Sequence, residues 1–145
     1  DENIVPIIAD AVDYLKLRIS SKIELGFYAE QAEIMTKVNK SLMEWVVENI
    51  VKNAVDAMEG KGKITVNLKQ IENEIILDIT DTGKGIAPGK LKTVFQPGFT
   101  TKARGWGLGL SLVKRIVEEF HQGKISVHKS ELNIGTTFRV ILNAK

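Results

Sequence analysis

Residues 73–85, with the sequence NEIILDITDTGKG, contain the features that decide how this chain folds. Apolar and polar residues alternate through 73–80, as they do in a strand that buries one face. Asp81 ends that strand, and Gly83 and Gly85 then allow the backbone to turn sharply. A carboxylate at the end of an apolar strand has to be hydrogen-bonded. Asp81 is therefore either the cap of a tight turn or an acceptor for a donor group of a ligand.

The segments on both sides of this strand have clear periodicities. Strand-like alternation in 62–69, followed by a polar turn, predicts a hairpin with 73–80. Helical spacing of apolar residues recurs three times, and further strand candidates surround it. Helices are predicted at 4–18, 41–58 and 107–121, and further strands at 22–28, 35–39, 124–130 and 135–142. Hairpins with helices between them indicate an α+β two-layer sandwich with the helices on one face.

Length and composition indicate one ordinary globular domain. The chain has 145 residues, of which 43% are hydrophobic and 26% charged, and it has no cysteine. The net charge of +2 gives no reason to expect a nucleic-acid or membrane partner. No apolar run approaches the roughly 20 residues of a membrane span, and no signal peptide is visible. Because the chain starts at Asp1 rather than at a methionine, we expect it to be a fragment of a longer protein, with 1–145 forming a single domain.

The distribution of charge is uneven within the chain. The segment 82–117 has no acidic residue and is rich in glycine. Its cations are Lys84, Lys90, Lys92, Lys102, Arg104, Lys114 and Arg115. Such a segment is either a solvated basic loop or a site for a polyanion, for which phosphate is the obvious candidate.

The predicted helix at 41–58 has a polar row beside its apolar stripe. Asn49, Asn53 and Asp56 share one face at spacings of four and three residues. Asparagine is unfavourable inside a helix because its amide competes for backbone hydrogen bonds. The row is either a casual wet face or a set of oxygen ligands for a hard cation such as Mg²⁺.

Three alternating glycines, at 105, 107 and 109, precede the helix predicted at 107–121. Backbone N–H groups at a helix start form an anion site, and glycines let phosphates approach it. This pattern is weak by itself. The dinucleotide-binding motif has a different spacing, and residues 85–91 fail as a phosphate loop because Leu91 stands where serine or threonine is required.

Five motifs in order resemble the catalytic domains of bacterial sensor histidine kinases. They are the Asn-x-x-x-Asn helix (48–57), Asp-x-Gly-x-Gly (81–85), a Phe-containing loop (94–102), Gly-x-Gly-x-Gly (105–109) and Gly-Thr-Thr-Phe (135–138). In that family these are the N, G1, F, G2 and final Gly-Thr boxes. The resemblance covers nearly the whole chain. It implies the Bergerat ATP-binding fold of the GHKL superfamily, a mixed, mostly antiparallel sheet with three helices on one face.

The resemblance also implies a site. Asp81 would bind the adenine amine, supported by Thr136 through water, and Asn53 would hold Mg²⁺ between the phosphates with Asn49 nearby. The segment 87–106 would be the ATP lid, anchored by Phe95 and Phe99, with Lys102 and Arg104 meeting the phosphates. Asn49, Asn53 and Lys102 would be the catalytic residues. The residues implied to contact the nucleotide are Asn53, Asp56, Asp81, Gly83, Gly85, Ile86, Phe95, Thr101, Lys102, Arg104, Gly105, Gly107, Leu108, Gly109, Leu110 and Thr136.

A histidine kinase domain of this kind transfers the γ-phosphate of Mg-ATP to a histidine on a separate phosphoacceptor domain of the same parent protein. The response regulator is an indirect partner, and the expected location is cytoplasmic, in a parent that is soluble or anchored in the inner membrane. His121 and His128 lack the family's phosphoacceptor context, and His121 is expected to be a helix-end residue. We therefore expect the isolated chain not to phosphorylate itself.

Two rival classes share the fold. ATPases of the gyrase, MutL or Hsp90 type have a glutamate four residues before the asparagine that binds Mg²⁺. Here that position is Asn49, which cannot act as a base, and Glu48 is rotated by about 100° around the helix. Serine kinases of the anti-sigma type are the second rival. The short double-Phe lid segment favours a histidine kinase over them.

Overall fold

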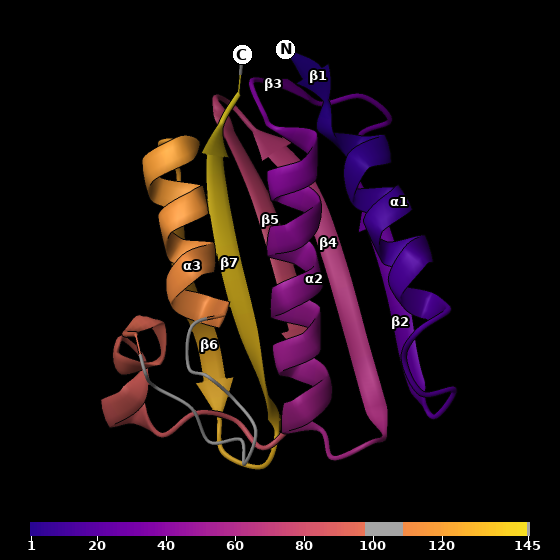
Figure 1. The fold of residues 1–145 in the computed structure, drawn as a ribbon, viewed down its shortest axis with the longest axis vertical. Coiled ribbons are helices and arrows are strands. Elements are labelled where there is room, and N and C mark those ends of the chain that lie inside the picture. Colours follow the sequence, from indigo (N-terminus) through magenta and orange to yellow (C-terminus); the bar gives the residue numbers. More distant parts are fainter. Residues whose placement is uncertain (98–108, 145) are drawn as a thin grey trace.

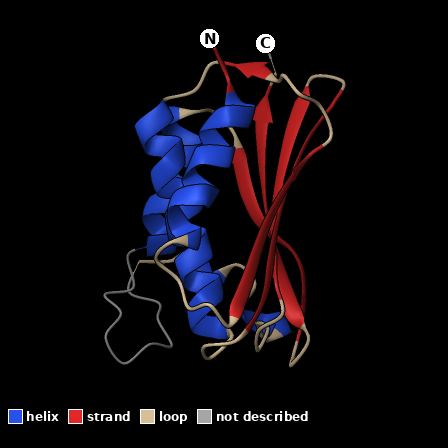
Figure 2. Cartoon of the chain, turned by 90° about the vertical axis from the view of Figure 1, so that its right-hand side faces the viewer, coloured by secondary structure: helices blue, strands red, loops and turns tan. Residues whose placement is uncertain are grey.

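The computed structural model describes residues 1–97 and 109–144. In this part of the chain a five-stranded sheet is covered on one face by three helices (Figures 1 and 2). The helices are α1 (Ile4–Lys16), α2 (Lys40–Ala57) and α3 (Gly109–Arg115), the last continued by a π-helical turn η3 (Ile116–Phe120). The strands are β1 (Glu2–Asn3), β2 (Ile23–Ala29), β3 (Met35–Thr36), β4 (Gly62–Ile71), β5 (Glu74–Asp81), β6 (Lys124–Glu131) and β7 (Gly135–Asn143).

The sheet has the strand order β2-β4-β5-β7-β6. The β2–β4 pair is parallel and the other three pairs are antiparallel, so the sheet is mixed and mostly antiparallel, which confirms the predicted fold class. The strand that ends in Asp81 lies at its centre, between β4 and β7. In this register Asp81 stands opposite Ile64 on one side and Thr136 on the other.

The core lies between the sheet and the helices. Alternate residues of β4 and β5, including Ile64, Val66 and Leu77, are buried beneath α2. The buried stripe of α2 consists of Met43, Val46, Val47, Ile50, Val51 and Ala54. Ala57, the last residue of α2, is only half-buried. Its carbonyl accepts a hydrogen bond from the backbone N–H of Lys84 in the glycine loop (3.0 Å).

Three local features differ from the pattern expected from the sequence. The strand predicted at 35–39 shrinks to β3, which pairs with β1 outside the main sheet. The segment 87–106, expected to be the ATP lid, contains two short 3₁₀ helices in its described part, η1 (Pro88–Lys90) and η2 (Thr93–Phe95). The last predicted helix changes to π geometry after Arg115, where His121 Nδ1 lies 2.9 Å from the Ile116 carbonyl oxygen. None of the described helices has both the length and the apolar character needed to cross a bilayer.

Candidate functional site

The segments that carry the sequence motifs approach one another toward one end of the sandwich. The C-terminal ends of β5 and α2 lie at the bottom of the view in Figure 1, and α3 begins above them, beside α2. The glycine loop after β5 is tied to the end of α2 through the Lys84–Ala57 hydrogen bond. The start of α3 lies beside α2, since a Cβ built on Gly109 would be in van der Waals contact with Asn49 Oδ1, at 3.6 Å. Segments far apart in the sequence thus frame one site.

Asp81 is a buried acid, with 4% of its surface exposed. The backbone N–H of Gly83 donates to Asp81 Oδ1 at 2.8 Å, closing the turn that the sequence predicted. Burial raises the pKa of the Asp81 carboxyl above its ordinary value, and the backbone amides of Gly83 and Thr136 offset part of that rise. A buried carboxylate with a raised pKa gains from one more donor. The amine of a bound base would supply it, and the capping interpretation of Asp81 is correct at the same time.

The two glycines of this loop are needed because the protein itself packs closely against them. A Cβ on Gly83 would lie 2.7 Å from the carbonyl oxygen of Ala57 at the end of α2. Gly85 has a φ of +77°, and a Cβ there would collide with the carbonyl of Glu131 in the turn between β6 and β7. The Lys84 carbonyl also accepts a hydrogen bond from the Asn133 backbone N–H (2.8 Å). The loop is therefore clamped between α2 and the β6–β7 turn.

Ser130 is a site residue that the sequence analysis missed. Its hydroxyl lies 2.7 Å from the backbone nitrogen of Ile86, from which it accepts a hydrogen bond, and 2.9 Å from the hydroxyl of Thr136. Ser130 and Thr136 face each other across β6 and β7, and Thr136 faces Asp81 across β7 and β5. A serine opposite a threonine in the last predicted hairpin was the available signal, but using it requires the strand register, which depends on the turn length.

The polar row of α2 is less tightly hydrogen-bonded than the loop around Asp81. Asn49 donates from its Nδ2 to the Trp45 carbonyl (2.8 Å), which turns its carbonyl oxygen toward the start of α3. Asn53 is half-buried, and no hydrogen bond from the described residues engages its amide. Asp56 is exposed one turn further along. Amide oxygens on one face suit a hard cation, and the described residues hold no group of three acidic or histidine side chains that would bind a metal alone. A cation here would need the phosphate oxygens of a ligand as partners.

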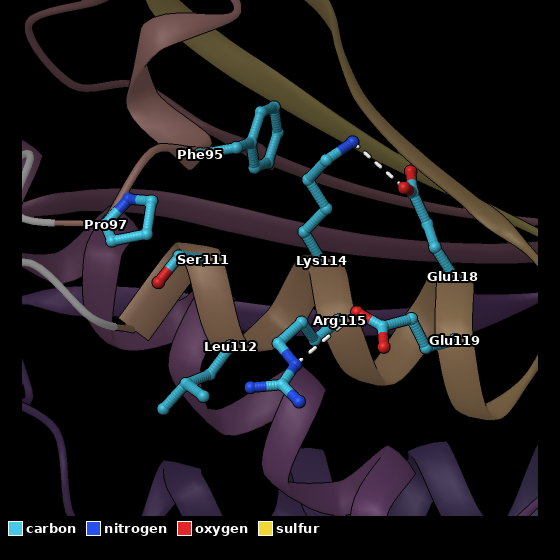
Figure 3. A pocket seen from close by; sticks show the side chains of 8 residues that line it. All are labelled: Phe95, Pro97, Ser111, Leu112, Lys114, Arg115, Glu118 and Glu119. Atoms are coloured by element: carbon cyan, nitrogen blue, oxygen red, sulfur yellow. Dashed lines mark ion pairs between the residues drawn. The ribbon is translucent and has the colours of Figure 1, made fainter.

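Phe95 lies in the hydrophobic core and packs edge-on against Phe138 of β7, with ring centroids 5.9 Å apart. This packing fits the anchoring role that the resemblance implies. On the outer side of Phe95 a cavity of about 350 Å³ runs along α3 (Figure 3). Lys114 pairs there with Glu118 (2.9 Å) and Arg115 with Glu119 (3.4 Å). These two cations of the acid-free segment are thus compensated within their own helix and contribute little charge to a phosphate site.

Several predicted site residues lie outside the described residues. They are Phe99, Thr101, Lys102, Arg104, Gly105, Gly107 and Leu108, together with Trp106. Gly109 and Leu110 begin α3 at the site edge, and Leu110 packs against the core. The structure therefore joins Asp81, Gly83, Gly85, Ile86 and Thr136 through the glycine loop and the ends of β5, β6 and β7. Gly109 lies beside Asn49, which shares one face of α2 with Asn53 and Asp56.

The buried carboxylate, the clamped glycine loop and the amide-lined face of α2 suit a nucleotide ligand. The family model described as "Histidine kinase-, DNA gyrase B-, and HSP90-like ATPase" matches residues 38–145. The chain therefore belongs to this family, whose members bind ATP. The family resemblance inferred from the five motifs is confirmed.

The relatives found are kinases. The chain is 40% identical over 124 residues to the sensor histidine kinase ZraS of Salmonella typhi, covering 85% of this chain and 26% of that protein. It is 33% identical to sporulation kinase E of Bacillus subtilis, covering 98% of this chain and 19% of that protein. The chain thus spans about a quarter of these relatives' length or less.

Solved structures agree with this assignment. The catalytic domain of the histidine kinase ThkA superposes with a TM-score of 0.87 at 26% identity, covering 98% of this chain and 95% of that one. The mycobacterial sensor histidine kinase MprB superposes with a TM-score of 0.85 at 27% identity, covering 99% and 95%.

Proposed function

We propose that this domain binds Mg-ATP and donates the γ-phosphate to a histidine on a separate helical phosphoacceptor domain of its parent protein, in two-component signalling. The kinase names of the relatives support the class. The single observation that carries the proposal is the identity and position of the side chain beside the phosphate end of the site. That side chain is an amide and not a carboxylate.

Asn49 occupies the position at which a hydrolase of this superfamily has its glutamate. Its amide is held by the Trp45 carbonyl, and its oxygen faces the start of α3. An amide cannot remove a proton from water. The neighbouring acid, Glu48, forms an ion pair with Lys52 (3.0 Å) and lines a groove between α1 and α2 on another face of the helix. Without a general base for water, phosphoryl transfer to an external nucleophile is favoured over hydrolysis.

The described residues would act mainly by binding and orientation, which supply most of the catalysis in phosphoryl transfer. Asp81 would accept a hydrogen bond from the adenine amine, with the Gly83 loop and Thr136 holding the carboxylate. Asn53 would provide an oxygen ligand for Mg²⁺, which neutralises phosphate charge when bound. Lys102, Arg104 and the glycines before α3 are proposed to meet the phosphates, as the family resemblance implies.

The phosphoacceptor domain would be presented in cis or in trans within a dimer, with a response regulator receiving the phosphoryl group afterwards. We propose a cytoplasmic location for the domain, where ATP is available. His121 does not compete as an acceptor, because its Nε2 accepts from the Asn39 backbone N–H (3.1 Å) and its Nδ1 bonds the Ile116 carbonyl.

A labelling experiment tests the proposal. Incubation of the isolated chain with γ-labelled ATP and Mg²⁺ should leave it unlabelled and release phosphate slowly. Adding the helical phosphoacceptor domain of the parent as a separate chain should produce an acid-labile, base-stable phosphate on that domain, with a rate that rises with its concentration. Rapid hydrolysis without a partner would instead place the chain with the gyrase-type ATPases. Label on His121 or His128 would contradict the proposal directly.

A further inference from the structure

The hydroxyl of Ser130 occupies a junction at the adenine end of the site. It accepts a hydrogen bond from the Ile86 backbone N–H at 2.7 Å and lies 2.9 Å from the Thr136 hydroxyl and 3.5 Å from the Gly135 carbonyl oxygen. A hydroxyl has one proton to donate. The Thr136 oxygen is the nearer of its two acceptors, at an ordinary hydrogen-bond length, whereas the carbonyl is at the limit. Either hydroxyl of the Ser130–Thr136 pair can donate to the other, and we assign the Ser130 proton to Thr136 because the Gly135 carbonyl oxygen lies farther away.

This direction determines what Thr136 offers to its surroundings. In this assignment the Thr136 oxygen accepts from Ser130, and the Thr136 proton points away from Ser130. Thr136 stands directly opposite Asp81 in the pairing of β7 with β5, and residues so paired project to the same face of a sheet. The site thus presents an acceptor, the Asp81 carboxylate, beside a donor, the Thr136 hydroxyl.

We infer that Ser130 is a positioning residue that sets the base selectivity of this site by fixing the direction of the Thr136 proton. The inference rests on the proposed nucleotide-binding role of Asp81 and Thr136. Adenine carries an amine donor next to a ring nitrogen acceptor, which matches carboxylate and hydroxyl in that order. Guanine carries a carbonyl acceptor next to an N–H donor, so both positions would be mismatched. Unpaired polar groups in a buried site are the strongest source of discrimination.

Loss of the Ser130 hydroxyl would free Thr136 to rotate. Its lone pairs could then face the ligand, and the ring nitrogen of adenine would lose its dedicated donor. If Ser130 only stabilised the loop, its removal would weaken the binding of all nucleotides to the same extent. A residue that orients a proton changes the ratio between nucleotides, and that ratio is the quantity to measure.

The experiment is calorimetric titration with ADP, GDP and 1-deaza-ADP, in which a CH replaces the ring nitrogen acceptor. Wild type should bind ADP more tightly than either analogue. Ser130→Ala should reduce the preference for ADP over 1-deaza-ADP by about tenfold, the value of one buried hydrogen bond. Ser130→Thr, which restores the hydroxyl, should keep the preference. Ser126→Ala, on the same strand, is the matched control and should leave it unchanged.

An unchanged ADP to 1-deaza-ADP ratio in Ser130→Ala would overturn the inference while leaving the proposed function intact. Equal binding of ADP and 1-deaza-ADP by wild type would overturn it too, even if the alanine variant failed to fold. Failure of wild type to bind ADP at all would contradict the proposed function as well.

Discussion

The two ends of the site differ in how far the protein has built them by itself. At the end of β5, the Asp81 carboxylate accepts a hydrogen bond from the glycine loop, which is clamped on both sides. Ser130 bonds both to Ile86 of that loop and to Thr136. On α2, the amide of Asn53 has no hydrogen bond from the described residues, and Asn49 is held only by its own helix. The end that we propose for the base is preorganised, whereas the end that we propose for the phosphates depends on what binds there.

The difference follows from the charge of what each end would hold. An uncharged base has to be recognised by groups fixed before it arrives, because their ordering would otherwise reduce its affinity. A polyphosphate brings its own charge and its own cation, and these supply partners that the protein need not carry. Mutations at the β5 end should therefore reduce the stability of the fold or the selectivity for the base. Mutations on α2 should instead reduce the Mg²⁺ dependence of nucleotide binding.

The strongest test of the preorganised end is Gly85→Ala. Gly85 has a positive φ, and an added Cβ would collide with the Glu131 carbonyl, so we expect a loss of about 2–4 kcal/mol in the free energy of unfolding. Gly60→Ala is the matched control, since Gly60 also has a positive φ but open space around it. Urea unfolding of both variants decides the matter. Equal losses would show that the clamp on the loop contributes nothing.

At the same end, Asp81→Asn should weaken ATP binding by about 1–3 kcal/mol, since it replaces a charged acceptor with an amide that presents a donor. Asp78→Asn is the control, because Asp78 lies on the same strand but points to the opposite face, where it pairs with Arg139 at 2.9 Å. Calorimetric titration with an ATP analogue measures both. If the two variants bind alike, Asp81 is not the base acceptor.

At the phosphate end, Asn53→Ala should remove about 1 kcal/mol or more of ATP affinity, and only when Mg²⁺ is present. Binding of ADP without metal should be almost unchanged, because the base end remains intact. Asn67→Ala, an exposed asparagine on β4, is the control. Titrations with and without Mg²⁺ give the answer. An undiminished Mg²⁺ effect in Asn53→Ala would make Asn53 an ordinary helix-face residue.

The smallest expected effect is the dependence of stability on pH. Burial raises the folded-state pKa of Asp81 above its ordinary value of 3.8, so the folded chain binds the proton more readily than the unfolded chain. Without nucleotide, the ionised carboxylate therefore costs stability near neutral pH, and that cost disappears as the pH falls through the folded pKa toward 3.8. The free energy of unfolding of wild type, minus that of Asp81→Asn, should rise on acidification. Urea titrations at several pH values would show a fall instead if Asp81 were stabilised as an ion.

Most of the fold could be predicted because it depends on local pattern. The alternation in β4 and β5, the helical spacing in α1 and α2, and the Asp81-Gly83 turn each specify their structure within a few residues. The order of five motifs then identified the family, and with it a mixed, mostly antiparallel sheet. That the β2–β4 pair is the parallel one came from the structure.

The tertiary structure decided which groups meet. Ser130 meets Thr136 because of the register of β6 on β7, and the glycine loop meets Ala57 because it docks on the end of α2. Lys114 and Arg115 looked available to a phosphate in a segment without acids, yet Glu118 and Glu119, one helical turn further on, pair with them. Local sequence determines backbone geometry because its interactions are short in range. The partners of a polar side chain depend on contacts between distant segments, which only the packed sheet and helices bring together.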